Sequence, residues 1–210
     1  SNAVPFIPGG NVGGGGVSNV LSSTIIANST IANNSSLAAG GGLLNVAGRV
    51  YSTNNTITQN QSDLFGGGIS TLLDVLEPLE VTYMRNTIVA ENTTTETGPL
   101  TNSNVSGSAG SFTSYGNNLI EDNAGGETDF PPSLFNDSTP LPNTKLDLVG
   151  SSLTQLISPM LSLLQNNGGP TDTRLPSTLS PAMNAGDNCV VTNTCIVDPD
   201  DKTPQEPLTT

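Results

Sequence analysis

Hydrophobic residues occur along this chain in short runs that alternate with polar positions, as at residues 24–26, 50–52 and 81–83. These runs are rich in Thr, Val, Ile and Tyr, which favour β-strands. A helical repeat would instead need roughly ten or more residues with apolar positions about 3.6 apart. Gly and Asn interrupt the runs every few residues, and both tolerate the positive φ of a tight corner. The pattern therefore predicts short strands joined by tight corners.

Two sequence markers repeat with the same period. Glycine triplets at 14–16, 40–42 and 66–68 are evenly spaced along the chain, and each precedes an apolar residue. The motif Asn-Ser-Thr-Ile-Ala-Asn-Asn at 28–34 aligns with Asn-Asn-Thr-Ile-Thr-Gln-Asn at 54–60, at the same spacing as the triplets. Two markers that share one period of about 26 residues indicate a genuine structural repeat, and such periods are typical of solenoids.

Later copies of the second marker are less regular. A third copy at 85–92 begins later than this period predicts, and a looser fourth copy lies at 117–123. The excess falls within 71–80, which is interpreted as a loop enlarged at one corner. A solenoid tolerates such insertions because each coil contacts only its neighbours.

Two or three short strands with Gly and Asn corners in each repeat predict an all-β fold, a right-handed single-stranded parallel β-helix of about 26 residues per coil. Residues 1–3 are typical of the remnant of an expression tag and are left out of the fold argument. Residues 4–140 are expected to form the coils, 141–190 a partly irregular C-terminal cap, and 191–210 a tail or linker.

The predicted cap contains an apolar run at 153–164 that is interrupted by Pro159. Because proline breaks a continuous helix, one or two short helical turns are expected to cover the C-terminal end of the bore. An amphipathic membrane-binding helix is disfavoured, since no Lys or Arg flanks the run.

Stacking of the coils assigns roles to individual residues. Inward-facing isoleucines are expected to form an aliphatic ladder, and asparagines in two corners are expected to stack with their amides hydrogen-bonded along the axis. Ordinary turn formation without ladder bonding is the alternative for the asparagines. The glycine triplets would allow a corner too sharp for Cβ atoms. The ladder residues are Ile31, Ile57, Ile88, Ile120, Asn28, Asn54, Asn34, Asn60 and Asn92.

The charge balance narrows the range of partners. Five Lys and Arg stand against 18 Asp and Glu, with no His, so the net charge is −13. Such a chain offers few cations to phosphate groups, which disfavours nucleic acid and anionic lipid as partners. No apolar run is long enough to span a membrane, and no cofactor or metal is expected. Cys189 and Cys195 are candidates for a local disulfide, which suits an exported protein, with free thiols as the alternative.

At this point the residues resemble a known group of proteins. The alternation of Gly-Gly-Gly-apolar with Asn-Ser-Thr-Ile-x-x-Asn resembles the repeats of bacterial β-helix surface proteins similar to the polymorphic outer-membrane proteins. Residues 164–173, Leu-Gln-Asn-Asn-Gly-Gly-Pro-Thr-Asp-Thr, together with 179–187, are similar to the closing segment of large secreted proteins with choice-of-anchor domains. Arg174 stands where that group often has His. The resemblance implies a secreted or cell-surface bacterial protein, and it supplies no catalytic residues.

Many β-helix proteins act on polysaccharides, so catalytic chemistry is the competing possibility. A glycosidase needs two carboxylates across the sugar, and a lyase needs a cationic base, for which Arg85, expected at the corner of Asn28 and Asn54, is the main candidate. Without His, a Ser-His-Asp triad is excluded. Calcium at 198–201 is disfavoured, because that segment lacks the glycine and distal glutamate of a dedicated loop. The carboxylate candidates are Asp74, Glu77, Glu80, Glu91, Glu121 and Asp122.

Two functions follow from these observations. The first is a non-catalytic extracellular or cell-surface module, structural or adhesin-like, whose expected partners are surface glycans or a neighbouring cell surface. The second is a carbohydrate-active enzyme, either a polysaccharide lyase or a glycoside hydrolase, with its site near the 71–80 loop. The scarcity of cations and the lack of His favour the first, and a monomer is expected.

Overall fold

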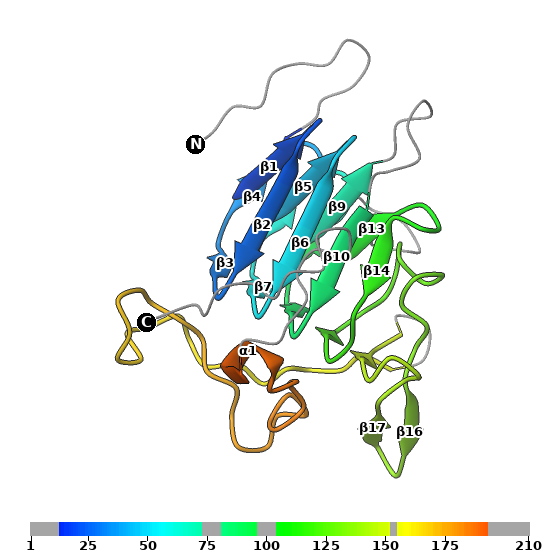
Figure 1. Ribbon diagram of the computed structural model, residues 1–210, viewed down its shortest axis with the longest axis vertical. Coiled ribbons are helices and arrows are strands. Elements are labelled where there is room, and N and C mark those ends of the chain that lie inside the picture. The colour runs from blue at the N-terminus through cyan, green and yellow to red at the C-terminus, as the bar shows by residue number, and fades with distance from the viewer. Residues whose placement is uncertain (1–12, 73–80, 96–103, 152–154, 193–210) are drawn as a thin grey trace.

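The computed structural model describes residues 13–72, 81–95, 104–151 and 155–192. It shows a parallel β-helix of about four coils, in which strands of successive coils lie side by side (Figure 1). A short antiparallel hairpin and one helical turn complete the described secondary structure. The predicted β-solenoid is therefore confirmed. No helix in these described ranges is long and apolar enough to cross a membrane.

Four parallel sheets form the walls. The first contains β1 (Val17–Val20), β5 (Leu43–Val46), β9 (Ile69–Leu72) and β13 (Val105–Gly107). The second contains β2 (Ser23–Ala27), β6 (Arg49–Thr53), β10 (Val81–Arg85) and β14 (Phe112–Ser114). The third contains β3 (Thr30–Ala32), β7 (Thr56–Thr58), β11 (Ile88–Ala90), β15 (Leu119–Ile120) and β18 (Leu148–Val149). The fourth contains β4 (Ser35–Ser36), β8 (Gln61–Ser62) and β12 (Thr93–Thr94).

The register between the first two coils follows the sequence repeat. Val17 pairs with Leu43 and Ile31 pairs with Ile57, so both pairings match the spacing of the glycine triplets. The next step in the third sheet is longer, because Ile57 pairs with Val89. Residues 71 and 72 of the predicted enlarged loop belong to β9, and 73–80 lie outside the described residues.

The aliphatic column inside the third sheet differs from the prediction at one position. Ile31, Ile57 and Ile120 belong to the column and are buried in the main core. Ile88 does not, because Val89 pairs with both Ile57 and Ile120. Ile88 instead packs on the outside against Leu119 and its neighbours. The prediction matched isoleucine with isoleucine, but the insertion is one residue longer than that alignment assumed.

Glycine is required in the triplets because a side chain there would meet its neighbours. A Cβ added to Gly42 would lie 2.7 Å from the Gly68 carbonyl oxygen, 2.9 Å from Asn60 Nδ2 and 3.0 Å from Ile57 Cγ2. All three approaches are shorter than ordinary van der Waals contact. The predicted explanation, a corner too sharp for Cβ, is correct.

The C-terminal end of the bore is closed differently from the prediction. Pairing continues to β18, past residue 140, and the buried Phe130 packs against Phe112 with ring centroids 5.4 Å apart. The hairpin of β16 (Leu134–Asn136) and β17 (Thr139–Leu141) follows Phe130. Residues 155–164, where helical turns were predicted, form none. They begin a segment, 155–192, that runs back beside the coils to α1 (Cys189–Thr192) (Figure 1).

Candidate functional site

One asparagine column lies inside the corner between the third and fourth sheets. Asn34 Nδ2 donates to Asn60 Oδ1, and Asn60 Nδ2 donates to Asn92 Oδ1, each at 3.0 Å. The same acceptors also receive the backbone N–H groups of Asn34 and Asn60 at 3.0 Å. This is the predicted amide ladder, and ordinary turn formation alone does not describe it. The ladder continues through Asn104 and ends on the Glu121 carboxylate.

A second asparagine column lies at an outer corner, between the second and third sheets. Its residues all have positive φ, which asparagine tolerates better than most residues. The predicted members Asn28 (φ 48°) and Asn54 (φ 56°) are exposed, and Asn54 Nδ2 donates to Asn28 Oδ1 at 2.5 Å. Asn86 and Asn117 continue the column. Arg85 was predicted at this corner, but it ends strand β10 opposite Thr53, because the corner needs a residue that accepts positive φ.

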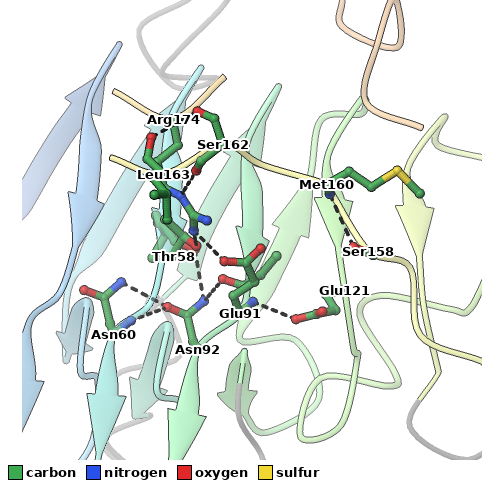
Figure 2. A network of polar contacts seen from close by, with 12 residues as sticks. Thr58, Asn60, Glu91, Asn92, Glu121, Ser158, Met160, Ser162, Leu163 and Arg174 are labelled. Atoms are coloured by element: carbon green, nitrogen blue, oxygen red, sulfur yellow. Dashed lines mark hydrogen bonds and ion pairs between the residues drawn. The ribbon is translucent and has the colours of Figure 1, made fainter. Parts of the chain in front are cut away.

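The segment 155–192 is fastened to the coils by a buried arginine (Figure 2). The Arg174 side chain, only 4% exposed, donates to the Glu91 carboxylate and, at 2.8 Å, to Thr58 Oγ1. Its Nε also donates to the Ser162 carbonyl at 2.6 Å. A buried charge is tolerated when it is paired and hydrogen-bonded, so these contacts join two coils to the returning segment.

The outer asparagine column fastens the same segment further along. Asn86 Nδ2 donates to the Asp187 carbonyl, and the Asp187 N–H donates to Asn86 Oδ1, both at 2.8 Å. Asn117 Nδ2 donates to the Ala185 carbonyl at 2.8 Å. Beneath these bonds, Ala182 and Ala185 pack against the outer face of the third sheet.

Arg85 takes part in this attachment. Its Nη1 lies 3.5 Å from the Asp187 carboxylate and donates to Cys189 Sγ at 3.4 Å. Its guanidinium also lies 5.7 Å from the centroid of the Tyr115 ring. Cys189 is disulfide-bonded, while Cys195 lies outside the described residues.

A groove of about 310 Å³ remains between the outer asparagine corner and residues 176–188. Four of the asparagines that line it, called the rim, are Asn54 and Asn117 of the coils and Asn184 and Asn188 of the returning segment. Its floor is aliphatic, with Ile88, Leu119 and Leu148 of the third sheet joined by Leu146 and Pro176. Polar groups around an apolar floor are typical of small-ligand sites.

The predicted carboxylate candidates that the structure describes do not line this groove. Glu91 is paired with Arg174, and one oxygen of Glu121 accepts the Glu91 N–H at 2.6 Å. Asp122 accepts the Ala124 N–H at 2.7 Å. Of the other candidates, Asp74, Glu77 and Glu80 lie outside the described residues, as does the segment 198–201 considered for calcium.

Two carboxyl groups have a shifted pKa. Burial raises the pKa of Asp147 above its ordinary value. Hydrogen bonds from Ser114 and Asn118 favour the charged form and partly offset this rise in pKa. Burial likewise raises the pKa of Asp122, opposed by its bond from the Ala124 N–H and reinforced by Glu127. Neither residue lines the groove. Asp147 stands at the end of a further column, where its Oδ1 accepts the Asn118 N–H at 2.9 Å and Asn118 Nδ2 at 3.0 Å.

Several features of the structure were not predicted from the sequence. A third ladder begins with Asn19 Nδ2 donating to Asn45 Oδ1 at 2.7 Å, and its signal was present as two asparagines one repeat apart. The stacked rings of Tyr51, Tyr83 and Tyr115, with centroids 4.8 and 5.6 Å apart, could also have been sought in the repeat. The groove has no local signal, because it depends on the path of 176–188. The chain matches no family model, no curated protein and no solved structure.

Proposed function

We propose that this protein is a non-catalytic extracellular or cell-surface module, a rigid β-helix with a structural or adhesin-like role. The resemblance of its repeats and closing segment to bacterial surface proteins supports this location. A disulfide at Cys189 also suits an exported protein, because such bonds persist in oxidising surroundings.

One observation carries the proposal: the candidate catalytic charges that the structure describes are used to hold the chain together. Glu91 is paired with Arg174, and Arg85 lies against Asp187 and the Tyr115 ring. Glu121 ends the inner asparagine ladder. A catalytic acid or base must reach a substrate proton, and groups occupied in this way are poorly placed to do so.

The alternative, a polysaccharide lyase or glycoside hydrolase, is tested by product formation. The protein would be incubated with a panel of neutral and uronate polysaccharides, while new reducing ends and unsaturated products are measured. We expect none above the level of a heat-denatured control. Turnover that persists through repeated purification and is lost in Glu77→Gln or Glu121→Gln would overturn the proposal in favour of an enzyme.

A further inference from the structure

The groove beside the outer asparagine corner has one wall that is held in place. Reciprocal hydrogen bonds between Asn86 and the backbone of Asp187, together with the bond from Asn117 to Ala185, fix residues 185–187 against the coils. The opposite wall is the β-helix itself. A site built on such fixed elements does not have to be ordered when a ligand binds, which reduces the entropic cost of binding.

The rim of the groove retains unused hydrogen-bonding capacity. Within the described part of the chain, Asn54 and Asn117 each use Nδ2 in a bond and leave Oδ1 without a partner. The side-chain amides of Asn184 and Asn188 make no hydrogen bond with other described residues, and both residues are exposed. An amide offers both a donor and an acceptor, so the rim can meet groups that also do both, as hydroxyls do.

The floor and the charges restrict the ligand further. Aliphatic side chains of Ile88, Leu146 and Pro176 can cover an apolar face of a ligand. Among the described residues, no Lys or Arg lines the groove, and the one carboxylate there, Asp187, is 42% exposed and lies 3.5 Å from Arg85 Nη1. Because the chain carries a net charge of −13, it would repel an anionic ligand unless a cation in the groove held that ligand.

We infer that this groove binds a neutral sugar unit, with ring hydroxyls on the asparagine rim and the C–H face on the aliphatic floor. The volume of about 310 Å³ lies at the lower end of the range for ligand pockets, which fits one or two sugar rings. This inference rests on the proposed binding module and deepens it, because it names a position and a ligand class.

Nuclear magnetic resonance of the intact protein tests the inference directly. Uniformly ¹⁵N-labelled protein would be titrated with cellobiose, maltose, lactose and N,N′-diacetylchitobiose, and with digalacturonic acid as the acidic counterpart. At least one neutral disaccharide should shift the side-chain amide signals of Asn54, Asn117, Asn184 or Asn188. Digalacturonic acid should bind more weakly than that neutral sugar.

Variants at positive-φ asparagines provide a matched comparison. Asn184→Gly (φ 60°) keeps the backbone conformation but removes a rim amide that makes no bond with other described residues, and should weaken binding roughly tenfold, since tenfold is about 1.4 kcal/mol. Asn33→Gly (φ 59°) removes an exposed amide at a different corner and should leave binding unchanged. Lack of binding by every neutral sugar, shifts confined to other surfaces, or equal effects of the two variants would each overturn the inference.

The outcomes for the groove and for the proposed function are separable. Sugar binding in the groove together with product formation would retain this inference and reject the non-catalytic role. Absence of both binding and products would reject the sugar site while the non-catalytic module stands.

Discussion

The asparagine column at 34, 60 and 92 lies inside the coils, whereas the column at 28, 54, 86 and 117 lies at an outer corner. In the inner column Asn60 is fully buried, and its amide bonds both to asparagines of the neighbouring coils and to backbone groups. In the outer column only Asn54 and Asn28 are joined amide to amide. Asparagine therefore satisfies buried hydrogen-bonding groups at the inner corner, whereas at the outer corner it binds the segment 155–192.

The two columns should contribute differently to stability, because removing an amide has different consequences for its hydrogen-bonding partners in each. Inside, no water replaces a lost partner, so a broken bond leaves buried groups unsatisfied, which costs about 1–3 kcal/mol for each. Outside, water can take the place of the amide. Stability should consequently depend on the inner column, while the outer column is free to bind the segment 155–192 and, by our proposal, a sugar.

The largest loss of stability is expected for Asn60→Ala. The substitution leaves the Asn34 N–H without its acceptor, removes the side-chain bond to the Ile31 carbonyl, and removes one of the two bonds to Asn92 Oδ1, which keeps the Asn60 N–H. We expect a loss of about 3 kcal/mol or more in the free energy of unfolding, measured by urea denaturation. The matched outer variant is Asn54→Gly, which keeps the positive φ and should cost less than about 1 kcal/mol. Equal losses in the two variants would contradict the distinction between the columns.

An intermediate loss of stability is expected when the contact that holds the segment 155–192 against the coils is removed. Arg174→Met removes the ion pair with Glu91 and the bond to Thr58, and should cost about 2 kcal/mol, below the range for fully buried pairs because the Glu91 side chain is 30% exposed. The loss should be local. Hydrogen exchange should speed up in 155–192 while the amides of β5, β6 and β7 stay protected.

The exposed cation Lys145 supplies the control for this prediction. Its Nζ makes one long bond, 3.4 Å, to the Ser114 carbonyl. Lys145→Met should therefore leave exchange in 155–192 unchanged. Faster exchange throughout the coils of Arg174→Met would mean instead that the segment and the β-helix unfold as one unit.

The coils could be predicted from the sequence because, with a strict period, equivalent positions in successive coils have the same environment and need similar residues. Wherever the period is kept between neighbouring coils, as at Ile31 and Ile57, residue identity and structural position agree. The prediction was wrong at Ile88 and Arg85, where the insertion removed the period and two strand-forming residues, Ile88 and Val89, both suited the column. Only the pairing with Thr56 and Ile57 separates them.

The path of 155–192 could not be predicted for a different reason. Its contacts join residues far apart in sequence, such as Arg174 with Thr58 and Asn86 with Asp187, 116 and 101 positions apart. No period connects these residues. The apolar run at 153–164 was predicted to form short helical turns, yet residues 155–164 form none, and Leu156 and Leu163 are 56% and 78% exposed. The site depends on this path, so the groove could not be predicted either.

The smallest change in stability is expected at Asp147. Its carboxylate ends the column that contains Asn118, in a position where an amide would also fit. Asp147 is 1% exposed, and burial raises its pKa, so at pH values between the unfolded and folded pKa the folded protein holds more of this proton than the unfolded chain does. Its contribution to stability therefore falls as pH rises from the unfolded value, about 3.9, through the raised folded value, and stays low at neutral pH.

Asp147→Asn keeps an acceptor for both bonds from Asn118 and removes the buried charge. We expect a gain on the order of 1 kcal/mol at pH 7, the scale on which burial of a polar group is felt. The gain should shrink as pH falls toward 4, because Asp147 then becomes neutral in the parent protein. Paired urea denaturations at pH 7 and pH 4 measure the difference, and subtracting the parent removes the similar contribution of Asp122. A loss at pH 7 would mean that hydrogen bonds favour the charged form of Asp147 and that the column ends on a carboxylate for stability. A gain that is the same at both pH values would mean that the protonation of Asp147 does not set the difference.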